Sequence, residues 1–101
     1  MPSRIQLKRT KGWRKPAGAV VVTRSTRYGN PFKIGDEGVP DAATAVRLFR
    51  DLAQREMREL GPDKVREFFG PLRGKDLACW CPLDAPCHAD VLIEFANKPD
   101  L

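Results

Sequence analysis

The chain has 101 residues, of which 42% are hydrophobic and 31% charged, a composition typical of one globular domain and not of a disordered chain. No apolar run approaches the roughly 18 residues that a membrane span requires, and the first residues lack the apolar segment of a signal peptide. We therefore expect a single domain over residues 1–101 that lies in the cytoplasm, or in the host cytoplasm if a phage encodes it, and has no membrane partner.

The net charge of +5 is unevenly distributed along the chain. Residues 1–35 contain nine Lys or Arg and no Asp or Glu, whereas the remaining residues hold nine Lys or Arg against 13 Asp or Glu. A basic segment of this kind favours contact with an anionic partner, phosphate above all, although a solvated charged face explains the same pattern.

Two strands are predicted in the first third of the chain. Residues 4–9 alternate apolar and polar side chains, as a short half-buried strand does. Residues 19–24, AVVVTR, are rich in β-branched side chains, which is typical of a central strand buried on both faces. In the loop that follows, Asn30-Pro31 disfavours the α conformation and Gly29 permits a positive φ, which indicates a sharp turn.

Two helices are predicted in the middle of the chain. From residue 40 or 41 to residue 60, apolar residues recur every three or four positions, and Gly61-Pro62 then ends the helix. Asp63 is a candidate N-cap for a shorter helix, DKVREFFGPL, whose end is disturbed by Gly70-Pro71.

The last third contains a further strand and helix. Residues 76–81, DLACWC, predict the strand, and a helix is expected from residue 84 or 85 to residue 97, with Pro86 in its first turn. Helices that alternate with buried strands indicate an α/β fold. We expect a small single domain with a short mixed or parallel sheet of about three or four strands, flanked by about three helices.

All three cysteines and the single histidine lie in one segment, ACWCPLDAPCHADVL. Side chains alternate along a strand, so Cys79 and Cys81 are expected on one face and Trp80 on the other. Cys87 and His88 would follow in the first turn of the last helix. Three thiolates and an imidazole are a ligand set for zinc, but two adjacent helical residues point about 100° apart, which makes Cys87 and His88 an awkward pair.

The same segment supports two further interpretations. A strand-to-helix turn is a common place for an active site, because the helix dipole lowers the pKa of Cys87 and His88 can act as its base. On that interpretation Cys87 and His88 are the catalytic candidates. Alternatively, the cysteines are small buried apolar residues and His88 is a hydrogen-bonded core histidine.

A second candidate site lies in the loop TRSTRYGNPF. Arg24 and Arg27 suit phosphate, Tyr28 suits stacking on a base, Gly29 allows close backbone approach and Asn30 offers an amide, a combination that favours a nucleotide. A purely structural turn is the alternative. If the strands that precede the two candidate sites are parallel neighbours, both sites face one cleft.

The segments TRYGNPF and LRGKDLACWCPLDAPCHADVL resemble a family of small phage and bacterial proteins, domain-of-unknown-function family 4326. The resemblance covers nearly the whole chain. It implies membership of that family and little chemistry, since the family is defined without a function.

Two functional hypotheses follow from these residues. The first is a domain that binds a nucleotide or nucleic acid in a basic cleft, with Arg24, Arg27, Tyr28 and Asn30 on one wall and the cysteine-histidine segment on the other. The second is a zinc-stapled module, with Cys79, Cys81, Cys87 and His88 as ligands, that binds a host protein or DNA without catalysis. Whether the protein is an enzyme is left open, because the sequence has no P-loop and no G-x-G-x-x-G motif.

Overall fold

The computed structural model describes residues 2–23 and 25–98. In this part of the chain the elements are β1 (Arg4–Gln6), β2 (Val20–Val21), α1 (Ala42–Leu60), α2 (Pro62–Phe69), a 3₁₀ turn at Gly70–Leu72, β3 (Leu77–Cys79) and α3 (His88–Ala96). The expected small α/β fold is confirmed, and its sheet is parallel.

The sheet has the strand order β1-β3-β2, so β3 is its central strand. Gln6 pairs with Cys79 on one side of β3, and Val21 pairs with Ala78 on the other. The prediction that residues 19–24 form the central strand is wrong: β2 is a half-buried edge strand of two residues, whereas β3 is buried throughout. Val22 is buried just beyond the end of β2, so an apolar run did not identify the centre of the sheet.

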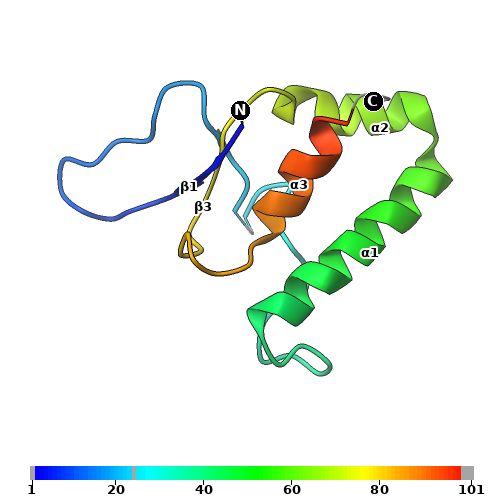
Figure 1. Cartoon of the computed structure of the whole chain (residues 1–101), viewed down its shortest axis with the longest axis horizontal. Helices are drawn as coiled ribbons and strands as arrows, with labels where there is room; N and C mark the ends of the chain where they lie inside the picture. Colours follow the sequence, from blue (N-terminus) through cyan, green and yellow to red (C-terminus); the bar gives the residue numbers. More distant parts are fainter. Residues whose placement is uncertain (1, 24, 99–101) are drawn as a thin grey trace.

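The helices lie together on one side of the strands, with α3 beside β3 (Figure 1). The long helix predicted from residue 40 or 41 to residue 60 is confirmed, and the Asp41 side chain caps it by accepting a hydrogen bond from the Thr44 N–H at 2.8 Å. Gly61 ends it with a φ of 84°, a conformation that glycine adopts most readily.

The two shorter helices begin at other residues than predicted. α2 begins at Pro62, and Asp63 lies in its first turn instead of capping it. α3 begins only at His88, with Cys87 as its N-cap, so Pro86 precedes the helix. Proline disfavours the α conformation of the residue before it, here Ala85, which explains why the helix does not begin at residue 84 or 85 as predicted.

The core lies between the sheet and the helices. Its largest fully buried side chains include Leu72, Leu77, Leu92 and Phe95. At the surface, Arg50 of α1 donates two hydrogen bonds, of 2.6 and 3.1 Å, to the carboxylate of Glu94 of α3. The core and this pair hold α1 against α3, and α3 in turn packs on β3.

Candidate metal and ligand site

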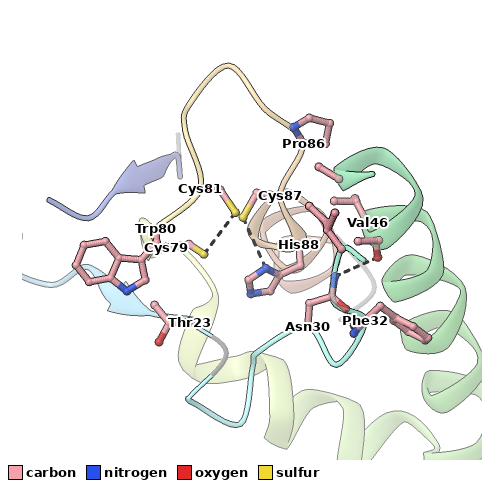
Figure 2. A pocket seen from close by; sticks show the side chains of 13 residues that line it. Thr23, Asn30, Phe32, Val46, Cys79, Trp80, Cys81, Pro86, Cys87 and His88 are labelled. Carbon is pink, nitrogen blue, oxygen red and sulfur yellow. Dashed lines mark hydrogen bonds between the residues drawn. The ribbon is translucent and has the colours of Figure 1, made fainter. Parts of the chain in front are cut away.

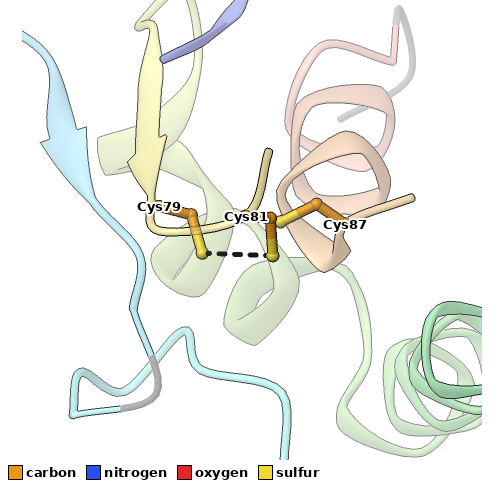
Figure 3. A group of neighbouring side chains, drawn as sticks. All are labelled: Cys79, Cys81 and Cys87. Carbon is orange, nitrogen blue, oxygen red and sulfur yellow. Dashed lines mark hydrogen bonds between the residues drawn. The ribbon is translucent and has the colours of Figure 1, made fainter. Parts of the chain in front are cut away.

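The three cysteines meet where the central strand ends. Cys79 is the last residue of β3, Cys81 follows two positions later, and Cys87 is the N-cap of α3. Their sulfur atoms all lie within 4.8 Å of one another, and those of Cys79 and Cys81 are 3.8 Å apart (Figure 3). Three cysteines at this spacing are close enough to hold a metal ion.

Arg4 of β1 fixes the turn that separates Cys81 from Cys87. Its Nη2 donates to the carbonyl oxygens of Pro82 and Leu83, at 3.2 and 2.7 Å. Its Nη1 lies 3.4 Å from the carboxylate of Asp90, and the side chain is only 8% exposed. The hydrogen bonds from Arg4 therefore fix the conformation of the turn. In this way a residue of the first strand helps to hold the sulfur of Cys81 near that of Cys87.

His88 begins α3 and points toward the end of β2. Its Nε2 lies 2.6 Å from the carbonyl oxygen of Val22, and because a carbonyl can only accept, Nε2 carries the proton. In the neutral ring Nδ1 then has a lone pair, and it lies 3.6 Å from the Cys87 sulfur (Figure 2). Cys87 is not a helical residue but an extended cap, with φ −147° and ψ 146°, so the 100° separation expected of two helical neighbours does not apply. His88 nevertheless stays outside the group of three cysteines, as expected of an awkward pair.

The three thiols differ in acidity. The pKa of Cys87 is lowered, chiefly because the Cys79 thiol donates a hydrogen bond to its thiolate, with a further contribution from the Ala89 backbone N–H that burial partly opposes. The same hydrogen bond and burial raise the pKa of Cys79, and burial raises that of Cys81. Cys87 is therefore the thiol that ionises first, although its residue is only 2% exposed.

A cleft of about 210 Å³ lies against the cysteines and His88. It sits outside the carboxyl ends of β2 and β3, which is where ligands bind in open α/β sheets. Its walls include Thr23, Asn30, Phe32 and Trp80, and Figure 2 places the rings of Trp80 and Phe32 on opposite sides of the cysteines. None of the described residues that line it is Lys, Arg, Asp or Glu.

The lining of this cleft corrects one prediction and adds residues that the sequence did not indicate. Trp80 was expected to face away from the cysteines, but β3 ends at Cys79, so strand alternation no longer governs Trp80, which lines the same cleft. Phe32 and Arg4 had no signal of their own. A charged residue at position 4 that clamps a turn at position 82 is visible only in three dimensions.

The predicted nucleotide loop is divided between two places. Asn30 reaches the cleft, but it is buried, its amide donates to the Ala45 carbonyl at 3.0 Å, and its oxygen accepts from the Phe32 N–H at 2.9 Å. These bonds hold the loop against α1. Arg24 lies outside the described residues.

Arg27, Tyr28 and Gly29 line a different cavity, of about 250 Å³, between this loop and helices α1 and α2. The Arg27 guanidinium carbon lies 5.5 Å from the ring centre of Tyr28 and 5.0 Å from that of Phe68, and the Tyr28 hydroxyl donates to the Phe68 carbonyl at 3.3 Å. Of the predicted ligand-binding residues that the structure describes, Asn30 alone lines the cleft of the cysteines.

The fold and the site define a class: a small α/β domain with a thiol-lined cleft at the carboxyl edge of a parallel sheet. The sequence model of one family, described as Domain of unknown function (DUF4326), matches residues 5–98, and the chain belongs to this family. No curated protein and no solved structure matches the chain. Among the described residues, no helix combines the length and apolar character needed to cross a bilayer.

Proposed function

We propose that the protein binds one zinc ion through the thiolates of Cys79, Cys81 and Cys87, and that this ion forms part of a ligand-binding cleft. The observation that carries the proposal is the approach of all three sulfurs to within 4.8 Å of one another. Two sulfurs bonded at about 2.3 Å to one tetrahedral zinc lie about 3.8 Å apart. The sulfurs of Cys79 and Cys81 have a separation of 3.8 Å.

The chemistry of these thiols also supports zinc. Thiolates are soft ligands that favour zinc and Cu(I) over the hard cations. A zinc ion binds thiolates and so displaces the thiol protons. Cys87, whose pKa is lowered, would supply the first thiolate, and the attraction of the ion would overcome the raised pKa values of Cys79 and Cys81.

The number of ligands supports a role in binding as well as in folding. Among the described residues no further Cys, His, Asp or Glu belongs to the group of three. Zinc sites with three protein ligands keep their fourth position for water or a ligand, whereas purely structural sites close it. In this site His88 would lie beside the ligand Cys87 without binding the zinc. The alternative is that His88 is the fourth zinc ligand, and the experiment must distinguish the two.

The test measures zinc in the full chain, purified under reducing conditions without added metal. We expect one equivalent. We expect Cys79→Ser, Cys81→Ser and Cys87→Ser each to lower the affinity at least tenfold in competition with a chromophoric chelator. Thr23→Ser, in the wall of the same cleft, is the matched control and should leave the affinity unchanged. His88→Gln should keep the full equivalent if three cysteines suffice.

A protein that takes up no zinc, and whose three thiols react with an alkylating reagent equally with and without zinc, would contradict the proposal. Loss of zinc only in His88→Gln would replace the three-thiolate site with a Cys₃His site.

A metal-free thiol site is the second candidate, because the pKa of Cys87 is lowered and His88 Nδ1 lies 3.6 Å from its sulfur. In this role Cys87 is the nucleophile and His88 its base. Alkylation near neutral pH should then modify Cys87 first, and His88→Gln should shift the pH at which it reacts. Equal rates at all three cysteines would exclude this function.

We also propose that the basic loop between β1 and β2 contacts nucleic acid or a host protein, and the only support for this proposal is the positive charge of the loop. Lys8, Arg9, Lys11, Arg14 and Lys15 are all exposed on the loop between β1 and β2, which extends away from the helices (Figure 1). Binding of DNA through this loop should weaken steeply as salt rises. Absence of binding to single-stranded and duplex DNA at low salt would remove nucleic acid from this proposal.

A further inference from the structure

We infer that the ligand of the cleft is an uncharged nitrogen heterocycle of about nucleobase size, which binds the zinc through a ring nitrogen and packs against Trp80. This inference rests on the proposed zinc site and names the ligand class for its fourth position.

The charge of the site selects a neutral ligand. Three thiolates and one Zn²⁺ leave a net negative charge, and no Lys or Arg is among the described residues that line the cleft to offset it. The buried side chain of Arg4, which clamps the turn after Cys81, is already paired with Asp90. An anion at the fourth position would therefore meet a negative site of low polarity, and such a site repels anions strongly. A neutral imidazole-type nitrogen is a common zinc ligand and adds no charge.

The side chains that line the cleft favour a ligand whose main part is flat and apolar. Trp80 is 46% exposed and Ile34 60%, two of the large exposed apolar side chains of the described chain, and both line this cleft. The guanidinium carbon of Arg9 lies 4.8 Å from the centre of the Trp80 ring system and helps to hold the indole in place. Aromatic side chains at such a rim bind the face of a planar ring by stacking.

The size of the cleft limits the ligand to a small ring system. Its volume of about 210 Å³ lies below the roughly 300–1,000 Å³ of sites for drug-sized ligands. A ribose or phosphate attached to the ring would extend out of the cleft. Outside the cleft, the guanidinium of Arg9 on the Trp80 ring is the contact that we infer for such a phosphate. Free bases and nucleotides would then share the same recognition chemistry inside the cleft.

The test uses the full chain with Co²⁺ in place of zinc, because cobalt absorption reports both its thiolates and its fourth ligand. We expect intense sulfur-to-cobalt charge-transfer absorption. Imidazole and adenine should change the ligand-field bands saturably, whereas inorganic phosphate at equal concentration should not. Trp80→Ala should weaken adenine about tenfold and leave cobalt uptake unchanged. Leu60→Ala is the matched control, since Leu60 is 49% exposed and does not line the cleft of the cysteines.

The outcomes separate this inference from the function on which it rests. Without charge-transfer absorption, the zinc site itself fails. If that absorption forms but heterocycles leave the ligand-field bands unchanged, or phosphate alters them, or Trp80→Ala binds adenine as tightly as the parent chain, the ligand class is wrong and the zinc site stands. If the inference holds, tighter binding of AMP than of adenosine identifies a nucleotide, and equal binding identifies the base alone as the recognised part.

Discussion

Nε2 of His88 donates a hydrogen bond to the carbonyl oxygen of Val22 at 2.6 Å, which joins residues 66 positions apart in the chain. It connects the start of α3 to the end of β2, the two sides of the cleft that carries the cysteines. Both groups are buried, so neither has water as a substitute partner. His88 therefore has a structural role, because its ring links α3 to β2. The same hydrogen bond fixes the orientation of the ring, which places the lone pair of Nδ1 near the Cys87 thiol.

Replacement of His88 should separate these two roles. His88→Leu leaves the buried Val22 carbonyl without its donor and should lower the free energy of unfolding by about 1–3 kcal/mol. His88→Gln retains an N–H donor of similar reach and should cost clearly less. Urea denaturation of both variants gives the comparison, and equal stabilities would mean that the hydrogen bond to Val22 contributes nothing measurable.

Arg4 should act on the metal site from outside it. Arg4→Met removes both hydrogen bonds to the carbonyls of Pro82 and Leu83, which frees the turn between Cys81 and Cys87. We expect zinc affinity to fall about 10- to 100-fold, the usual cost of losing a group that positions metal ligands. Arg66→Met removes an equal charge from an exposed pair on α2 and should leave affinity unchanged. Equal affinities of the two variants would show that Arg4 does not position the cysteines.

Asn30 should be important for stability and not for ligand binding. Asn30→Asp keeps the acceptor for the Phe32 N–H but replaces the amide that donates to Ala45. The free energy of unfolding should fall by about 1–3 kcal/mol at neutral pH. Part of this should return at acid pH, where a protonated carboxyl can donate. Gln54→Glu makes the same chemical change on the exposed face of α1 and should stay within about 0.5 kcal/mol of the parent. A comparable loss in both variants would contradict the assignment.

Glu94 should make stability depend on pH. Its pKa is lowered, first by the hydrogen bonds from Arg50, so the stabilisation is present above the unfolded pKa of about 4.3 and is lost as pH falls through the folded value. Both side chains are more than one-third exposed, and solvent screening limits the contribution to about 0.2–1 kcal/mol.

The comparison of Glu94→Gln with the parent chain tests this pair. At pH 7 the variant should be less stable by that amount, and the difference should shrink progressively as pH falls below the unfolded pKa of about 4.3 and should also shrink in high salt. Glu67→Gln, which removes an exposed carboxylate from α2, is the control for net charge. A gap between parent and Glu94→Gln that changes with neither pH below about 4.3 nor salt would rule out the ion pair as its origin.

Local patterns were enough to predict much of this protein. The apolar spacing of residues 41–60 and the Gly61-Pro62 pair placed the long helix closely, because a helix end depends on backbone preferences of a few neighbouring residues. The clustering of Cys79, Cys81 and Cys87 within ten positions likewise indicated that their sulfurs would meet. Family membership was also evident from the segments around Asn30 and Cys87.

Other features depended on contacts between distant segments. That β3 and not β2 is the central strand follows from pairing with residues more than 50 positions away, which an apolar run does not encode. The division of the loop, with Asn30 at the cleft and Tyr28 in another cavity, was decided by packing against α1 and α2. So was the role of Arg4, since a side chain that clamps a turn some 78 residues away has no local signature.

The sequence alone therefore determines that the three cysteines that can bind a metal lie in one short segment of the chain. Their common orientation, and the uncharged aromatic cleft beside them, exist only because a parallel sheet brings the ends of β2 and β3 to the same edge.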